Sequence, residues 1–364
     1  MGKKSNIAGI IDIGSNSIRL KIGQNKKGEL VVLETASFPL LLGRDTFAEG
    51  KVNFEKAAKA CDIIKNFRKL CTEYGADTIR VTAGASIREA SNRSYILDQI
   101  YLKTGLSVEL NDNQDEKLYI YKLMHMLLPE NYKQSSLLVY SGSGNAGVAL
   151  VKEGKIPYIQ TIRTGSLRLS EMFGEVHEYS NEFSLLVEEY LKSFTDYISL
   201  DKSAKNFIAC GNEMILISEL TGAVKNGNFL VIEKSAFDAL YANIKSKSVK
   251  IIAEEYNISE ETAELLLPAM AVYGNLISFT RAEQILSPHV YFIDAVLYET
   301  LFPEVFAKID SVIYESASIA ARTTAIRFGC SEKHFSSVEG FAIAIFDKMK
   351  KLHGLSQKHK VILS

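Results

Sequence analysis

The chain is poor in cysteine and lacks long apolar runs. It has four cysteines in 364 residues, Cys61, Cys71, Cys210 and Cys330, without metal-site spacing and with no need to pair. No apolar run is long enough to cross a bilayer, and the N-terminus lacks the basic, apolar and small-residue order of a signal peptide. We therefore expect a cytoplasmic protein without a membrane partner.

An excess of charge of one sign is also lacking. Lysine and arginine number 42 and aspartate and glutamate 43, which gives a formal net charge of −1. No global basic field is present to recruit nucleic acid. Any site for a polyanion must therefore be local. The six histidines are scattered and form no metal-binding pair, so a solvated or hydrogen-bonded role is favoured for each.

The chain does have a polar turn between two apolar segments close to its start. Residues 7–11 are apolar and lead into Asp12, then come Gly14, Ser15, Asn16 and Ser17, and an alternating segment follows. This order predicts a strand, a tight turn and a second strand. Glycine lets the backbone approach a ligand, hydroxyl and amide groups suit an anion, and the carboxylate suggests a hydrated divalent cation. The same residue types are common in ordinary turns, so both interpretations stay open.

The remaining chain alternates predicted helices and strands. A helix over residues 53–74, with Asn53 as its cap, follows three strands, and helix–strand repeats come next. From residue 135 the three-strand opening is repeated at 137–140, 148–152 and 155–161. Two apolar-faced helices are predicted at 311–329 and 331–353. The order indicates an α/β protein with an internal duplication.

The stretch Asp12-Ile13-Gly14-Ser15-Asn16-Ser17 resembles the first phosphate motif of the exopolyphosphatase / guanosine pentaphosphate phosphohydrolase (Ppx/GppA) family. The resemblance implies an actin-like (ribonuclease H-like) α/β fold, with duplicated domains around a central cleft and C-terminal helices added. On this basis we place an N-terminal domain at residues 1–128 and a second domain at 129–302. A helical segment at 303–364 would be the start of an HD-like region.

The resemblance continues along the chain and suggests which residues form the site. Arg88 and Asn92 stand where the family keeps the same residue types. Asp115 falls where the family has its proposed general base, and Glu116 is next to it. Acidic residues are also normal in the first turn of a helix. The resemblance implies catalytic roles for Asp115 and Glu116, a metal role for Asp12, and phosphate binding by Gly14, Ser15, Asn16, Arg88, Gly142, Gly144 and Asn145.

The second hairpin departs from the family pattern. The family's Asp-Ile-Gly-Gly-Gly-Ser-Thr-Glu stands here as Tyr-Ser-Gly-Ser-Gly-Asn-Ala-Gly, over residues 140–147. Gly142 and Gly144 are kept, but Tyr140 replaces a metal-associated aspartate and Gly147 a catalytic glutamate. Two negative charges are lost, which weakens the hold on Mg²⁺, the implied cofactor.

Two functions remain in view from the sequence. The first is a phosphohydrolase of weakened activity that releases terminal phosphate from inorganic polyphosphate or guanosine pentaphosphate. The alternative is a catalytically silent relative that binds polyphosphate or a nucleotide as a sensor or partner-binding protein. We expect a homodimer formed through the C-terminal helices, and no nucleic-acid partner.

Overall fold

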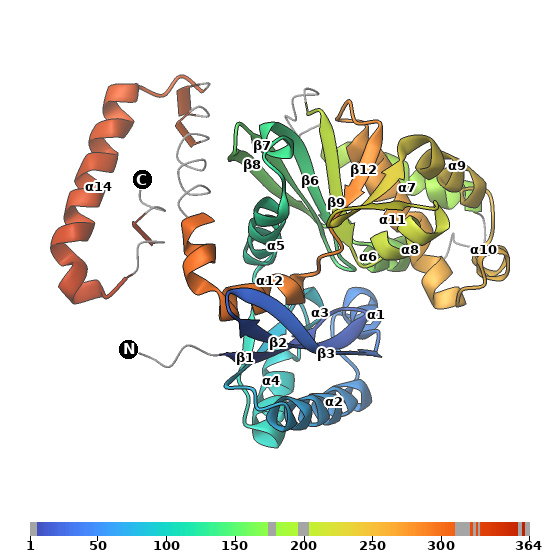
Figure 1. The fold of residues 1–364 in the computed structure, drawn as a ribbon, viewed down its shortest axis with the longest axis horizontal. Coiled ribbons are helices and arrows are strands. Elements are labelled where there is room, and N and C mark those ends of the chain that lie inside the picture. Colours follow the sequence, from blue (N-terminus) through green and yellow to red (C-terminus); the bar gives the residue numbers. More distant parts are fainter. Residues whose placement is uncertain are drawn as a thin grey trace.

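A computed structural model describes residues 6–173, 180–195, 204–309, 321–322, 325–326, 328–355 and 359–360, and the side chains of 113–115, 180–181 and 194–195 are outside this description. Two lobes lie against each other, with the C-terminal helix α14 (Glu332–His353) at one side (Figure 1). The predicted helix at 311–329 falls largely outside the described residues. None of the described helices combines the length and apolar composition needed to cross a bilayer.

The first lobe is built on a five-stranded sheet with the order β3-β2-β1-β4-β5. Its strands are β1 (Ile7–Ile13), β2 (Ser17–Lys26), β3 (Glu29–Pro39), β4 (Thr78–Ala83) and β5 (Val108–Leu110). Its helices are α1 (Leu42–Glu49), α2 (Phe54–Glu73), α3 (Ala85–Arg88) and α4 (Arg93–Thr104). The Asn53 side chain caps α2 by accepting from the Glu55 backbone N–H at 2.8 Å, as predicted. Apolar side chains from α2 and α4 pack on this sheet and form its core.

The second lobe repeats this plan in a seven-stranded sheet with the order β10-β11-β12-β9-β6-β7-β8. Its strands are β6 (Ser135–Ser141), β7 (Ala146–Lys152), β8 (Lys155–Ile162), β9 (Asn206–Gly211), β10 (Val224–Asn226), β11 (Phe229–Glu233) and β12 (Gln284–Ser287). Its helices are η1 (Tyr132–Gln134), α6 (Ser166–Phe173), α7 (Ser180–Thr195), α8 (Met214–Leu220), α9 (Lys234–Ile244), α10 (Val249–Tyr256) and α11 (Glu260–Ile277). In both sheets an antiparallel three-strand meander is followed by two parallel strands, which is the expected duplication.

Two helices join the lobes. Helix α5 (Asn113–Leu127) packs on β6 and β8 of the second sheet, and α12 (Phe292–Leu301), which follows that sheet, packs on β1 and β2 of the first. Their side chains form one shared core with Ile10 of β1 and Leu138 of β6. The domain limits at 128 and 302 stay predictions, and the described contacts cross both of them.

Candidate functional site

The tip of the first hairpin is a turn of fixed shape between β1 and β2. The Gly14 backbone N–H donates to the Ser17 carbonyl at 3.0 Å and closes the turn. The first turn of α1 holds the turn from behind, because the Gly43 N–H donates to the Ser15 carbonyl at 2.8 Å. Backbone contacts therefore position the side chains of the tip.

The tip of the second hairpin, between β6 and β7, is the same turn built again. The Gly142 N–H donates to the Asn145 carbonyl at 2.9 Å, as Gly14 does to Ser17. The Ser143 carbonyl accepts from the Arg168 N–H of α6 at 3.0 Å, which matches the contact at the Ser15 carbonyl. Ser143 and Asn145 are buried. The chain therefore presents two matching polar turns, one from each lobe.

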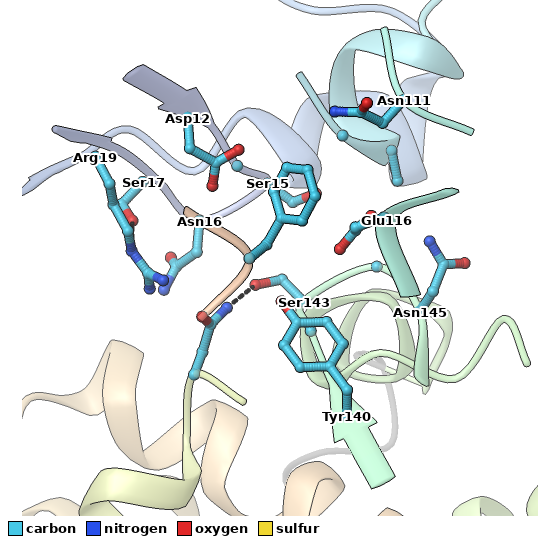
Figure 2. A pocket seen from close by; sticks show the side chains of 17 residues that line it. Asp12, Ser15, Asn16, Ser17, Arg19, Asn111, Glu116, Tyr140, Ser143 and Asn145 are labelled. Atoms are coloured by element: carbon cyan, nitrogen blue, oxygen red, sulfur yellow. Dashed lines mark hydrogen bonds between the residues drawn. The ribbon is translucent and has the colours of Figure 1, made fainter. Parts of the chain in front are cut away.

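The two tips face a single cleft between the lobes. Figure 2 shows Asp12, Ser15 and Asn16 on one side, Tyr140 and Ser143 on the other, and Glu116 of α5 beside them. The cleft is lined by Asp12, Gly14, Ser15, Asn16, Ser17, Arg19, Gly84, Ala85, Asn111, Glu116, Tyr140, Gly142, Ser143, Gly144, Asn145, Asn212 and Phe292. The structure thus brings together eight of the residues singled out from the sequence, namely Asp12, Gly14, Ser15, Asn16, Glu116, Gly142, Gly144 and Asn145.

Asp12 stands at the end of β1 with its carboxylate on the cleft wall. The Thr82 hydroxyl donates to its Oδ1 at 3.0 Å. Burial raises the pKa of Asp12 to about 6, the charge of Arg19 lowers it, and the charge of Glu116 adds to the rise. Without a further cation nearby, the ionised form of this carboxylate is therefore less favoured than in water.

Glu116 is the second carboxylate on the cleft wall, and it has a buried partner. The ammonium of Lys117 lies 3.2 Å from Glu116 Oε1 and 4.2 Å from the centroid of the Tyr140 ring. Burial lowers the pKa of Lys117 and the charge of Glu116 raises it. Burial also raises the pKa of Tyr140 well above its usual value, so its phenol is neutral. Three side chains of different chemistry are thus packed into one cluster.

Because Gly147 has no side chain, the aliphatic stem of Lys117 can pack against it. A Cβ atom at this position would lie 2.5 Å from the Tyr121 hydroxyl oxygen and 2.9 Å from Cγ of Lys117. Heavy-atom separations this short are repulsive. A side chain at 147, including a carboxylate, is therefore excluded while Lys117 and Tyr121 keep these positions.

The described donors around the cleft suit Mg²⁺, the cofactor that the resemblance implies, poorly, because one of the two lining carboxylates is held in an ion pair. Magnesium requires oxygen ligands in near-octahedral geometry, usually including one or two carboxylates. Asp12 and Glu116 are the carboxylates among the described lining residues, and Glu116 is already paired with Lys117. Within the described ranges, no three His, Cys, Asp or Glu side chains gather as a metal-binding set. We therefore assign no step to a bound metal.

One expected site residue, Arg88, is not among the described lining residues. The Arg88 guanidinium donates to the Asn111 carbonyl at 2.6 Å and lies 3.6 Å from the Glu89 carboxylate. It stands behind Asn111, which itself lines the cleft. The side chain of Asp115 lies outside the part of the chain that the structure describes, so its role stays a prediction.

Several lining residues were not anticipated from the sequence. Arg19 is the cross-strand partner of Asp12 in the β1–β2 register, and its Nε donates to the Ser17 hydroxyl at 3.2 Å. Hairpin register would have pointed to it, since residues equidistant from a tight turn face each other. Asn111 follows β5, and its buried Nδ2 has no hydrogen-bond partner in the described structure. Asn212 donates to the Ser143 hydroxyl at 3.0 Å.

Known proteins share both the sequence pattern and the architecture. The model of the Ppx/GppA phosphatase family matches residues 11–285. The fold is similar to that of a Ppx/GppA family member from Aquifex aeolicus, with a TM-score of 0.70 and 19% identity over 82% of this chain and 99% of that chain. An exopolyphosphatase from Cytophaga hutchinsonii is similar at a TM-score of 0.67 and 18% identity, over 81% of this chain and 97% of that chain.

A curated protein from Saccharomyces cerevisiae, Retrograde regulation protein 2, is 26% identical over 121 residues. The match covers 30% of this chain and 21% of the yeast protein, so the chain spans about a fifth of that relative.

These comparisons confirm the expected actin-like α/β fold with two mixed sheets and an added C-terminal helix. The family match runs through both hairpin tips and Glu116, and it covers most of the chain. The chain therefore belongs to the Ppx/GppA phosphatase family.

Proposed function

We propose that the cleft binds the terminal phosphates of inorganic polyphosphate or of a guanosine polyphosphate and slowly hydrolyses the terminal phosphoanhydride bond. The observation that supports this most is that two matching polar turns and Glu116 face one cleft. Turns that offer backbone N–H, hydroxyl and amide groups suit phosphate oxygens. Arg19 adds a cation to the wall, and Nδ2 of Asn111, which has no hydrogen-bond partner among the described residues, adds a donor.

We assign to Glu116 the role of activating the attacking water. Its carboxylate would accept a proton while the water oxygen bonds to the terminal phosphorus. The bond from that phosphorus to the bridging oxygen breaks, and the shortened chain leaves with the electron pair. Phosphoryl transfer depends on positioning and on neutralising charge, both of which the cleft supplies through its own side chains.

We expect this turnover to be slow. The resemblance places a metal-associated aspartate at position 140 and a catalytic glutamate at position 147, and this chain has tyrosine and glycine there. Losing such charge stabilisation raises the barrier by several kcal/mol, or about four orders of magnitude in rate. Metal-independent, weak phosphate release is therefore the expected activity.

A phosphate-release assay with long-chain polyphosphate tests the hydrolysis. We expect Glu116→Gln to lower the rate by roughly 100-fold, since it removes the group that accepts the proton. Asp12→Ala should also lower it. Glu260→Gln, at an exposed position in the first turn of α11, is the matched control. Equal release by the wild type, Asp12→Ala and Glu116→Gln would show that the activity does not arise in this cleft.

The second candidate is a catalytically silent protein that binds these anions as a sensor. The buried Lys117 and Tyr140, and the lack of space at Gly147, favour it, because they occupy the region where further carboxylates would be needed. A yeast relative whose name denotes regulation is consistent with it. Calorimetry with polyphosphate, guanosine tetraphosphate and ATP decides: heat without phosphate release supports the sensor, and no heat with any ligand contradicts both candidates.

The homodimer stays a prediction, and α14 offers a face for it. Val338, Phe341, Ile345 and Leu352 are 53%, 71%, 58% and 81% exposed, and their spacing places them along one side of the helix. Light scattering of the wild type and Phe341→Glu measures the oligomeric state. We expect a dimer and a monomer, respectively, and a monomeric wild type would contradict the prediction.

A further inference from the structure

Lys117 is a charged side chain buried directly behind the cleft wall. Its side chain is 1% exposed, although the long side chain of a lysine normally carries its ammonium group to solvent. Its two close neighbours, Glu116 and Tyr140, both line the cleft. The ammonium is therefore one layer of side chain away from any ligand in the cleft.

The surroundings of Lys117 are built to hold a cation. The Glu116 carboxylate at 3.2 Å supplies the ion pair, and the Tyr140 ring at 4.2 Å supplies a cation–π contact. A buried ammonium without such partners would be strongly unfavourable. The glycine at 147 gives space to the aliphatic stem, since a Cβ there would lie within 3.0 Å of Lys117 Cδ.

This arrangement changes the charge that an anion meets. Asp12 and Glu116 bring negative charge to the cleft wall, and Arg19 and Lys117 bring positive charge to the wall and to the layer behind it. The acidic and basic side chains offset each other without any added ion. A phosphate chain is therefore not repelled, whereas two uncompensated carboxylates would oppose it.

We propose that the ammonium of Lys117 is the resident counter-cation of the cleft and takes the part that a divalent metal would otherwise play. The cleft then binds phosphate chains without Mg²⁺. This inference rests on the proposed function, since it needs a phosphate anion in the cleft. It also assigns a role to a buried lysine that the hydrolytic step itself does not use.

Calorimetry with inorganic tripolyphosphate and the full chain tests this proposal. In excess EDTA we expect the wild type to bind, and millimolar Mg²⁺ should not strengthen the binding. Lys117→Met keeps the length of the stem and removes the charge, and it should weaken binding roughly tenfold or more. Lys122→Met is the matched control, because Lys122 is also buried on α5 but faces Tyr119 and Phe306.

A second variant keeps the test valid if Lys117→Met folds poorly. Glu116→Gln with Lys117→Met removes the ion pair as a unit, so neither charge is left buried without its partner. Because no uncompensated carboxylate then faces the anion, we expect the double variant to bind tripolyphosphate within about twofold of the wild type. Circular dichroism and the unfolding temperature establish that both are folded.

The outcomes separate the two proposals. No binding by the folded wild type, with or without Mg²⁺, overturns the proposed function and this inference together. Binding that appears only with Mg²⁺ overturns the inference and the expected metal independence, and leaves phosphate binding by the cleft standing. Unchanged affinity in Lys117→Met, or a double variant that binds tenfold or more weakly than the wild type, overturns it as well. Binding in EDTA that depends on Lys117 and not on Lys122 supports it.

Discussion

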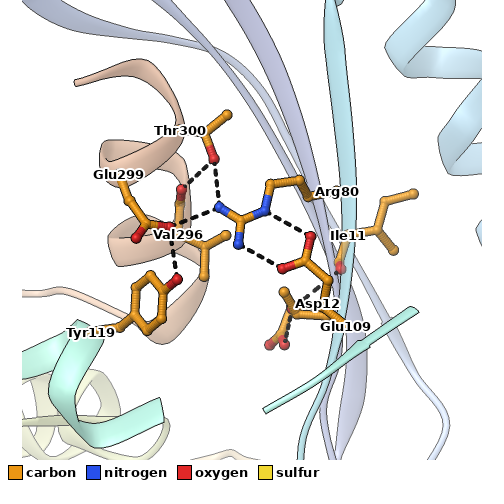
Figure 3. A network of polar contacts seen from close by, with 9 residues as sticks. Ile11, Asp12, Arg80, Glu109, Tyr119, Val296, Glu299 and Thr300 are labelled. Atoms are coloured by element: carbon orange, nitrogen blue, oxygen red, sulfur yellow. Dashed lines mark hydrogen bonds and ion pairs between the residues drawn. The ribbon is translucent and has the colours of Figure 1, made fainter. Parts of the chain in front are cut away.

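Arg80 of β4 donates from Nη1 to the Glu299 carboxylate of α12 at 2.9 Å, and so joins the first sheet to a helix that follows the second (Figure 3). The same guanidinium forms two hydrogen bonds with Glu109 at 2.9 and 2.6 Å, and the Tyr119 hydroxyl of α5 donates to Glu299 at 2.8 Å. One arginine thus connects β4, β5 and both of the helices shared by the lobes.

Arg80→Met should therefore destabilise the protein. The substitution leaves the partly buried Glu299 carboxylate without its arginine partner, so we expect a loss of roughly 2 kcal/mol in the free energy of unfolding. Denaturant unfolding measures it. Lys234→Met, which breaks an exposed pair with Asp238, should change stability by less than about 1 kcal/mol. Equal effects of the two substitutions would contradict the structural importance of the Arg80 network.

Gly147 should not tolerate a methyl group. The Cβ atom of Gly147→Ala would lie 2.5 Å from the Tyr121 hydroxyl oxygen, and we expect a cost of roughly 1–3 kcal/mol. That buried hydroxyl has no hydrogen-bond partner among the described residues, so Tyr121→Phe should cost little by itself and should restore part of the loss in the double variant. Additive effects in a thermal-unfolding cycle would argue against this contact. Gly340→Ala in α14, where a Cβ meets nothing, is the control.

The raised pKa of Glu213 predicts a pH-dependent change in the stability of the protein. It is buried behind the second tip and accepts from the Ser166 hydroxyl at 2.8 Å, and burial raises the pKa of Glu213 to about 7. The folded protein thus favours the neutral acid, and the cost of ionisation grows as pH rises from about 4.5 through about 7.

Glu213→Gln keeps the acceptor and removes the ionisation. It should therefore stabilise the protein by roughly 2 kcal/mol at about pH 8, with no gain at about pH 4. Urea unfolding at both pH values measures the difference. Glu219→Gln, at an exposed position on α8, the helix that Glu213 precedes, serves as the control. A gain that is the same at both pH values would contradict the shifted pKa.

Arg168 connects the second tip to the first lobe. Its Nε donates to the Gly144 carbonyl at 2.8 Å, its Nη2 donates to Glu89 at 2.7 Å, and its guanidinium carbon lies 4.2 Å from the centroid of the Phe47 ring. Arg168→Leu should weaken tripolyphosphate binding about five- to tenfold, because the tip is then less well positioned. Calorimetry measures it, with Arg163→Leu at an exposed position as the control. An unchanged affinity would show that the Arg168 contacts do not position the tip.

The local chemistry of the chain predicted much of the fold. The Asn53 cap and the tight turn after β1 are decided within a few residues, and both occur as predicted. Helix α12 was not predicted, because its segment is apolar on nearly all sides and shows no period that separates a buried helix from a strand. Contacts that join distant parts of the chain override such local signals.

The same reason limits what the sequence reveals of the candidate site. The hairpin residues and Glu116 could be anticipated from the resemblance, and the structure brings them to one cleft. Lys117 follows directly in the chain, where a lysine near the start of a helix normally faces solvent. Its burial depends on Gly147 and Tyr140, which come from another lobe and whose positions only the assembled fold defines.

The exchange of α5 and α12 between lobes has a consequence for synthesis on the ribosome. The first sheet is translated by residue 110, yet the helix that covers its β1 and β2 strands ends at Leu301. Until that helix emerges, one apolar face of the nascent first lobe stays exposed, because the helix that covers it is encoded nearly two hundred codons later. Chaperone capture of translation intermediates should thus be strongest between these two lengths.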